Sequence, residues 1–307
     1  MQPNLKVNIG RLELKNPVMV ASGTFGYGEE YAELYDISKL GAVVTKGISL
    51  KPREGNPMPR VVETASGLLN AIGLANVGVE VFLKEKLPFL RKSQATVIVN
   101  IFGESVEEYM AVALKLEGAM GISALEVNIS CPNVAAGGAC FATDAKLAEQ
   151  VTQAVRKVST FPLIVKLSPQ VSDISEIARA VAAAGADAVS LINTIPAMAI
   201  DHVTCRPVLA NVTGGLSGPA IKPIALKMIW DVSRAVKVPI IGMGGIMSTS
   251  DAIEFFLAGA TAVQVGTANF IRPTSAIDII SGIRTYLVDQ KMDDVRHIIG
   301  KLEISLT

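Results

Sequence analysis

The sequence predicts an α/β chain, residues 1–307, that folds as a single-domain (β/α)₈ TIM barrel. Eight short runs of β-branched and small apolar residues alternate with amphipathic helical stretches. Half of the residues are hydrophobic but only 5% are aromatic, which is typical of a core built on parallel strands buried on both faces. The length of 307 residues also suits this fold, since α/β barrels of roughly 250 residues commonly form one domain.

Eight segments are expected to form the barrel strands. The phrases AAGADAVSL and LAGATAVQV each contain a helix end at glycine followed by a buried strand, as repeated βα units with right-handed crossovers require. The predicted strands are Pro17–Ala21, Ala42–Lys46, Thr96–Ile101, Ala124–Asn128, Leu163–Leu167, Ala188–Ile192, Ile240–Gly244 and Ala262–Val265.

The intervening helices carry recognisable start signals. Ser105 and Glu108 fit a capping box, in which each residue satisfies a backbone N–H at the helix start. A second helix is expected to begin at Thr143 or Asp144. Ser250 or Asp251 is expected to cap a third.

Three segments are additions to the eight βα units of a minimal barrel. Lys6–Ile9 and Leu12–Leu14 are predicted to form an N-terminal β-hairpin that closes the barrel bottom. Long insertions follow the second and sixth strands, between Lys46 and Thr96 (with a helix near Val79–Leu90) and over Asn193–Pro219. Because long connections in compact domains are usually functional, both are expected over the catalytic face. A doubly wound sheet is disfavoured, since the first strand leads into ASGTFGYG rather than GxGxxG.

Charge and cysteine content exclude several classes of function. The 28 basic residues balance the 28 acidic ones without a basic block, so neither nucleic acid nor an anionic membrane surface is an expected partner. No apolar stretch is long enough to span a membrane, and Met1–Lys6 does not resemble a secretory signal. The three cysteines form no CxxC pair, which favours a reduced, cytoplasmic protein.

Hydrolase and metal sites are also disfavoured. The sequence has no GxSxG, HExxH or GxxxxGK[ST] motif and no Cys/His cluster, so no metal is expected. His202 and His297 are expected to have solvated or structural roles.

Candidate site residues follow from the fold, because barrel enzymes react at the C-terminal ends of their strands. Gly242–Gly245 and Gly266–Thr267 follow the last two strands, where barrels commonly hold a phosphate; the alternative is that these glycines only make tight turns.

Lys46 and Lys166 lie at the ends of apolar strands, and two lysines that point into one cavity favour an electron-rich ligand such as a reduced flavin. Several asparagines lie at strand ends or in covering loops and could bind a flat ring of alternating C=O and N–H groups: Asn70, Asn100, Asn128, Asn133 and Asn193.

Cys131 is the candidate acid/base. It lies three residues beyond Asn128 in a polar loop at the reactive face, and an ordinary thiol pKa near ~8.5 suits abstraction of a proton beside a carbonyl. Cys140 and Cys205 are instead expected to be small buried hydrophobic residues.

Together these residues resemble the dihydroorotate dehydrogenase family from about Leu5 to Tyr286. The motifs that carry the resemblance are TKG (45–47), NAIGL (70–74), NISCPNVAAGG (128–138), VKLSP (165–169), LINT (191–194), GGLSGPAIKP (214–223) and IGMGGI (241–246).

The resemblance implies oxidation of dihydroorotate to orotate, with Cys131 and Lys46 in catalysis. Cys131 would take the C5 proton while hydride passes from C6 to flavin N5. The implied FMN contacts are Ser22, Lys46, Gly47, Asn100, Asn128, Lys166, Ile192, Gly218, Gly244, Gly245, Gly266 and Thr267. The implied substrate contacts are Asn70, Ala71, Ile72, Gly73, Leu74, Asn128, Asn133, Asn193 and Thr194.

The opening ASGTFGYGEEY and the cysteine motif look most like the NAD-linked soluble type, although Ala135–Ala136 stand where related sequences often have a charged residue. That resemblance implies a heterotetramer of two catalytic chains and two partner chains, the partner carrying FAD and a [2Fe–2S] cluster. In agreement, this chain has no dinucleotide fingerprint, and three cysteines cannot supply a four-cysteine cluster site. Three alternatives stay open: a homodimeric fumarate-linked enzyme, a pyrimidine-reducing flavoenzyme, and a non-enzymatic FMN-binding barrel.

Overall fold

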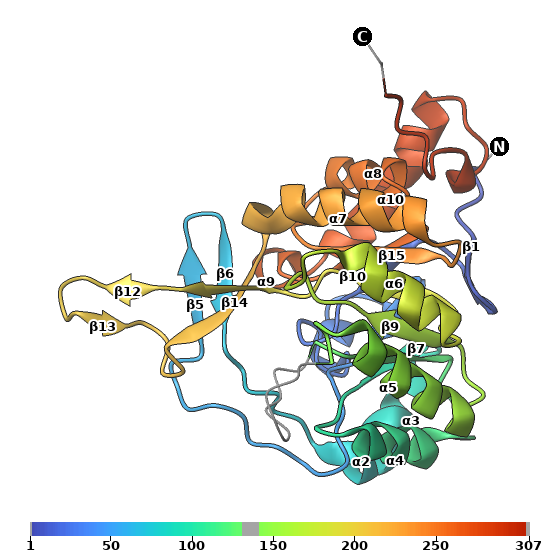
Figure 1. Cartoon of the computed structure of the whole chain (residues 1–307). Coiled ribbons are helices and arrows are strands. Elements are labelled where there is room, and N and C mark those ends of the chain that lie inside the picture. Colours follow the sequence, from blue (N-terminus) through green and yellow to red (C-terminus); the bar gives the residue numbers. More distant parts are fainter. Residues whose placement is uncertain (1, 131–140, 305–307) are drawn as a thin grey trace.

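Eight parallel strands close into a barrel in the order β10–β15–β16–β3–β4–β7–β8–β9. Figure 1 shows helices such as α5, α6 and α7 around these strands. The computed structural model describes residues 2–130 and 141–304. Each barrel strand lies within the segment predicted for it, so the fold class is confirmed. The strands are β3 Val18–Val20, β4 Ala42–Val44, β7 Val97–Ile101, β8 Ala124–Asn128, β9 Leu163–Lys166, β10 Ala188–Leu191, β15 Ile240–Met243 and β16 Ala262–Val265.

Helices surround the barrel and bury its outer face. Most strand residues are almost completely buried, because inward side chains fill the barrel and outward ones pack against helices. The helices are α1 Glu29–Ala32, α2 Gly78–Val81, α3 Leu87–Lys92, α4 Val106–Leu116, α5 Ala145–Val158, α6 Ile174–Ala183, α7 Lys222–Ala235, α8 Thr249–Leu257, α9 Ala268–Ile271 and α10 Ser275–Asp289. Short 3₁₀ turns cover Ile37–Lys39, Pro219–Ile221 and Val295–His297, and a π-helical turn at Phe82–Lys86 joins α2 to α3.

Helix caps follow the predictions in part. Asp144 caps α5 by accepting from the N–H groups of Lys146 and Leu147. Ser105 caps α4, but the Glu108 carboxylate accepts from the N–H of Glu104 rather than completing a box with Ser105.

The predicted cap of α8 was wrong. Ser248, not Ser250 or Asp251, is the N-cap residue, and Asp251 completes its capping box from the third helical position. The helix therefore begins one residue before Ser250. Asp251 stabilises its start by accepting hydrogen bonds from the backbone N–H groups of Met247 and Ser248.

The N-terminal hairpin, β1 Val7–Ile9 and β2 Leu12–Leu14, lies against the N-terminal ends of the barrel strands. Gly10 turns with a φ of +58°, and a Cβ there would lie 2.7 Å from the Cβ of Asp187, just before β10. Arg11 donates to the carbonyl of Thr160, before β9. This position agrees with the predicted closure of the barrel bottom.

The two long insertions join in one antiparallel sheet, which the sequence did not predict. Its order is β11 Ile195–Met198, β14 Thr213–Ser217, β6 Gly67–Asn70 and β5 Val61–Thr64. We call these four strands the arm sheet. The pairing of β14 with β6 joins the two insertions, and a small apolar cluster of Leu69, Ala71 and Leu209 packs beside it.

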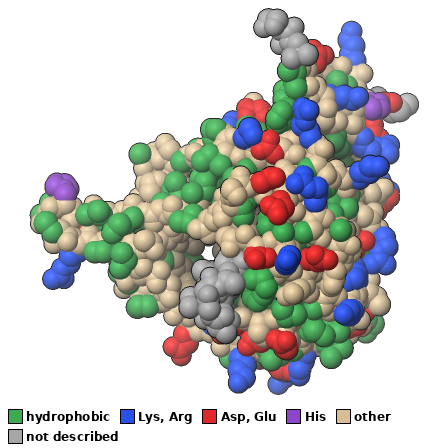
Figure 2. Space-filling view, viewed as in Figure 1, with side chains coloured by type: hydrophobic (Ala, Val, Ile, Leu, Met, Phe, Trp, Pro, Cys, Tyr) green, Lys and Arg blue, Asp and Glu red, His purple; other side chains and the backbone are tan. Residues whose placement is uncertain are grey.

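A hairpin of β12 Ile200–Asp201 and β13 Arg206–Pro207 projects beyond the arm sheet (Figure 1). Hydrophobic side chains are frequent on this projection, whereas charged side chains gather over the barrel helices (Figure 2).

Cys205 lies on the hairpin and is exposed, so its predicted burial was wrong; a turn that faces solvent on both sides offers it no core to enter. Cys140 lies outside the described residues. Within those residues, no helix has the length and apolarity needed to cross a membrane.

Candidate active site

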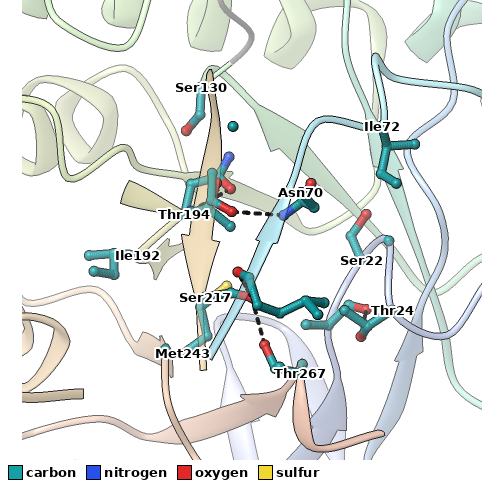
Figure 3. A pocket seen from close by; sticks show the side chains of 18 of the residues that line it. Ser22, Thr24, Asn70, Ile72, Ser130, Ile192, Thr194, Ser217, Met243 and Thr267 are labelled. Carbon is teal, nitrogen blue, oxygen red and sulfur yellow. Dashed lines mark hydrogen bonds between the residues drawn. The ribbon is translucent and has the colours of Figure 1, made fainter. Parts of the chain in front are cut away.

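One cavity of about 620 Å³ opens where the barrel strands end, between the barrel rim and the arm sheet. It collects side chains from strand ends far apart in the sequence; Figure 3 shows Ser22, Ile192 and Thr267 around it. All predicted site residues that the structure describes line this cavity: Ser22, Lys46, Gly47, Asn70, Ala71, Ile72, Gly73, Leu74, Asn100, Asn128, Lys166, Ile192, Asn193, Thr194, Gly218, Gly244, Gly245, Gly266 and Thr267. Cys131 and Asn133 lie outside the described residues.

Closely packed backbone forms one end of the cavity, at the loops after β15 and β16. Gly245 has a φ of +79°, and a Cβ on it would lie 2.9 Å from the carbonyl oxygen of Gly218 and 2.7 Å from the Cβ of Lys222. Thr267 donates to the hydroxyl of Ser217 over 2.8 Å, which ties the β16 loop to the arm sheet (Figure 3). Only glycine fits such a backbone, and the resulting surface of main-chain atoms suits a phosphate.

Two lysines supply positive charge to the cavity. Lys166, at the end of β9, is only 6% exposed, and Lys46 is half-buried after β4. Burial lowers the pKa of Lys46 and the charge of Arg60 lowers it further, while Glu30 acts in the opposite direction. Across the described part of the chain, neither lysine forms an ion pair with a carboxylate. Buried cations without a protein counter-charge favour an anionic or electron-rich ligand.

Amide acceptors line the deepest part of the cavity. Asn100 and Gln264 are each 1% exposed, and their oxygens, Oδ1 and Oε1, have no hydrogen-bond partner among the described residues. Buried acceptors are rarely left unpaired, so a ligand that brings N–H donors would satisfy them. Gln264 and the neighbouring Glu126 were not among the site residues predicted from the sequence. Each is a polar residue inside an otherwise apolar strand, AVQV for Gln264 and ALEVN for Glu126, and this could have indicated a buried functional role.

A second group of amides lies toward the arm sheet. Asn70 donates to the carbonyl of Gly215 in β14 over 3.1 Å, which orients it at the cavity wall. Asn193 donates to Asn128 over 3.4 Å and accepts from the N–H of Thr194 over 2.8 Å. The structure thus brings the predicted Asn70, Asn128 and Asn193 to one cavity, where converging amides can offer donors and acceptors to a polar ring.

The family model for dihydroorotate dehydrogenase matches residues 4–287. The chain belongs to the dihydroorotate dehydrogenase family. Chains named "Dihydroorotate dehydrogenase B (NAD(+)), catalytic subunit" are similar over nearly their whole length. The one from Trichlorobacter lovleyi is 58% identical over 99% of this chain and 100% of its own. Those from Geotalea uraniireducens and Geobacter sulfurreducens are each 57% identical, over 98% and 99% of this chain and 99% of their own.

The motifs shared with this family imply FMN as the cofactor of the chain. The cavity fits this group on three independent features. The glycine loops suit its phosphate, Lys46 and Lys166 suit an electron-rich ring edge, and the unpaired oxygens of Asn100 and Gln264 suit ring N–H. No described group of His, Cys, Asp or Glu side chains is arranged to hold a metal ion.

The crowding at Gly245 predicts that Gly245→Ala weakens FMN binding by about tenfold or more, because a displacement of this loop loses phosphate hydrogen bonds each worth roughly 1.5–3 kcal/mol. Titration of the deflavinated protein with FMN, followed by flavin fluorescence, measures the change. The matched control is Gly118→Ala, where φ is +75° but no atom lies within 4 Å of the new Cβ. Equal FMN affinity in the two variants would contradict the assignment of the phosphate loop.

Proposed function

We propose that this chain is the catalytic subunit of an NAD-linked dihydroorotate dehydrogenase, which oxidises dihydroorotate to orotate in pyrimidine biosynthesis. The observation that carries the proposal is that one cavity gathers the described residues of both predicted sets, those for FMN and those for dihydroorotate. The extent and degree of identity to chains of that name support the same activity.

FMN would be held at the ends of all eight barrel strands. Gly244, Gly245, Gly266 and Thr267 would bind its phosphate. Lys46 and Lys166 would face the part of the ring that gains negative charge on reduction, and the remaining contacts would come from Ser22, Gly47, Asn100, Asn128, Ile192 and Gly218. When bound, FMN supplies the acceptor for the hydride that leaves C6 of the substrate.

Dihydroorotate would lie between the ring and the arm sheet. The amides of Asn70, Asn128 and Asn193 and the hydroxyl of Thr194 would bind its carbonyl and N–H groups, together with Asn133. The segment Ala71–Leu74 would bind its carboxylate side; Gly73 and Leu74 both have positive φ there, at +72° and +59°. A substrate held on several polar groups keeps its C5 and C6 hydrogens at fixed positions, which is what proton and hydride removal require.

Cys131 would remove the C5 proton as the general base. A thiol is partly ionised near neutral pH, and the base must lose its proton to solvent before the next turnover. Lys46, whose pKa is lowered by burial, would contribute to catalysis by stabilising negative charge beside the reacting atoms.

Electrons would leave through a partner subunit that carries FAD and a [2Fe–2S] cluster, with NAD as the final acceptor and two copies of each subunit. The name of the relatives, an NAD(+) enzyme with a catalytic subunit, supports a second subunit. The present sequence has no dinucleotide fingerprint with which to bind NAD itself. We place the enzyme in the cytoplasm on its cysteine pattern, three residues without a CxxC pair.

Removing the base should slow the reductive half-reaction without abolishing ligand binding. We expect Cys131→Ala to bind orotate nearly normally but to reduce its flavin about 10²–10⁴ times more slowly with dihydroorotate, the range typical of a lost general base. Cys131→Ser should retain a little activity that rises with pH, because a hydroxyl is a far weaker base. Anaerobic stopped-flow absorbance measures both.

The control for this series is Cys205→Ala, which removes an exposed thiol from the projecting hairpin and should leave the rate unchanged. Flavin reduction at near-wild-type speed in Cys131→Ala would refute the role of this residue.

The two-subunit proposal predicts that the chain alone forms NADH from dihydroorotate slowly and that addition of the partner subunit raises the rate strongly. Absorbance at the NADH band measures it in matched assays with and without the partner. Rapid NADH formation by the lone chain would overturn this part of the proposal, and rapid fumarate reduction would favour the homodimeric enzyme.

A further inference from the structure

A carboxylate is buried inside the barrel directly behind the cavity. Glu126, in the middle of β8, is completely buried and lies inside a ring of donors from three other strands. It accepts from Asn100 Nδ2 over 2.7 Å, from Gln264 Nε2 over 2.7 Å and from Ser190 Oγ over 2.9 Å. No lysine or arginine of the described residues forms an ion pair with it.

The hydrogen bonds to Glu126 fix which way two amides point. A carboxylate offers only acceptors, so Asn100 and Gln264 must each turn their NH₂ group toward it. An amide group is planar, and its oxygen therefore faces away from Glu126. Both side chains line the cavity, and both oxygens are buried without a partner among the described residues.

We propose that Glu126 is a positioning residue that makes the cavity floor a pair of hydrogen-bond acceptors. It acts through Asn100 and Gln264, whose oxygens would then share the one N–H of the imide in the pyrimidine half of the bound FMN. The inference rests on the proposed function for the identity of the ligand. Glu126 would orient the two amides although it would touch neither the cofactor nor the substrate.

Glu126→Gln tests the inference because it conserves shape but removes one acceptor. Whichever way the new amide lies, its NH₂ group meets the NH₂ group of Asn100 or of Gln264. One of these side chains must turn over and present a donor, not an acceptor, to the ring. The NH₂ group of the side chain that has turned over would then face the ring N–H. We expect the dissociation constant for FMN to rise about tenfold or more, because a buried hydrogen bond to the ring is lost and two donors oppose each other.

A charge swap, Glu126→Gln with Gln264→Glu, separates positioning from packing. The amide introduced at position 126 would accept from Asn100 and donate to the carboxylate introduced at position 264, and both acceptors would again face the cavity. We expect FMN affinity to return to within about threefold of the wild-type value, because the donor and acceptor pattern toward the ring is restored. The control Ser190→Ala removes a donor from the same carboxylate without touching either amide, and should leave FMN affinity unchanged even if it lowers the melting temperature.

The measurement is titration of the deflavinated full chain with FMN, followed by flavin fluorescence, alongside the melting temperature without FMN. Weak FMN binding by Glu126→Gln, with FMN affinity restored in the swap variant, supports the inference. If Glu126→Gln does not fold, the FMN affinity of the swap variant alone tests the inference. Wild-type affinity in a folded Glu126→Gln variant overturns it, as does a folded swap variant that fails to recover. Absence of FMN binding by the wild-type chain would instead refute the proposed function.

Discussion

Closure of eight parallel strands into one barrel is the constraint on which the site depends. Because all the strands run in the same direction, their C-terminal ends meet at a single rim, and residues from Ser22 to Thr267 come to line one cavity. The opposite rim is closed by the N-terminal hairpin, where Gly10 packs against Asp187. The barrel therefore has one open end, and the arm sheet forms a wall over it.

Different parts of the cavity offer different chemistry. Exposed backbone at Gly244 and Gly245 suits an anion, Lys46 and Lys166 bring positive charge, and buried amide oxygens can accept hydrogen bonds from the N–H groups of a ligand. The amides toward the arm sheet form a further set, oriented by hydrogen bonds within the protein. Each region has a feature that costs free energy in the protein alone, such as a buried cation or an unpaired acceptor, and that cost is offset when a ligand of the right chemistry binds.

The sequence predicted what is encoded locally and missed what depends on contacts between distant segments. All eight barrel strands were found because each is a short apolar run between turn residues. The residues predicted at the strand ends, such as Lys46, Asn128 and Lys166, line one cavity in the structure. The arm sheet was missed because the pairing of Leu69 with Leu216 joins two insertions that lie far apart in the sequence. The hydrogen bonds of Glu126 to three other strands exist only once the barrel has closed. That the chain forms one domain, and the roles of individual residues, stay predictions.

The central claim is that this cavity oxidises dihydroorotate with an FMN bound in it. Anaerobic titration of the FMN-loaded protein with dihydroorotate tests it most directly, with the flavin absorbance and the orotate formed measured together. The account predicts that each bound FMN loses its visible absorbance as one orotate appears. Protein that retains FMN yet keeps its full flavin absorbance and forms no orotate in the presence of excess dihydroorotate would contradict it.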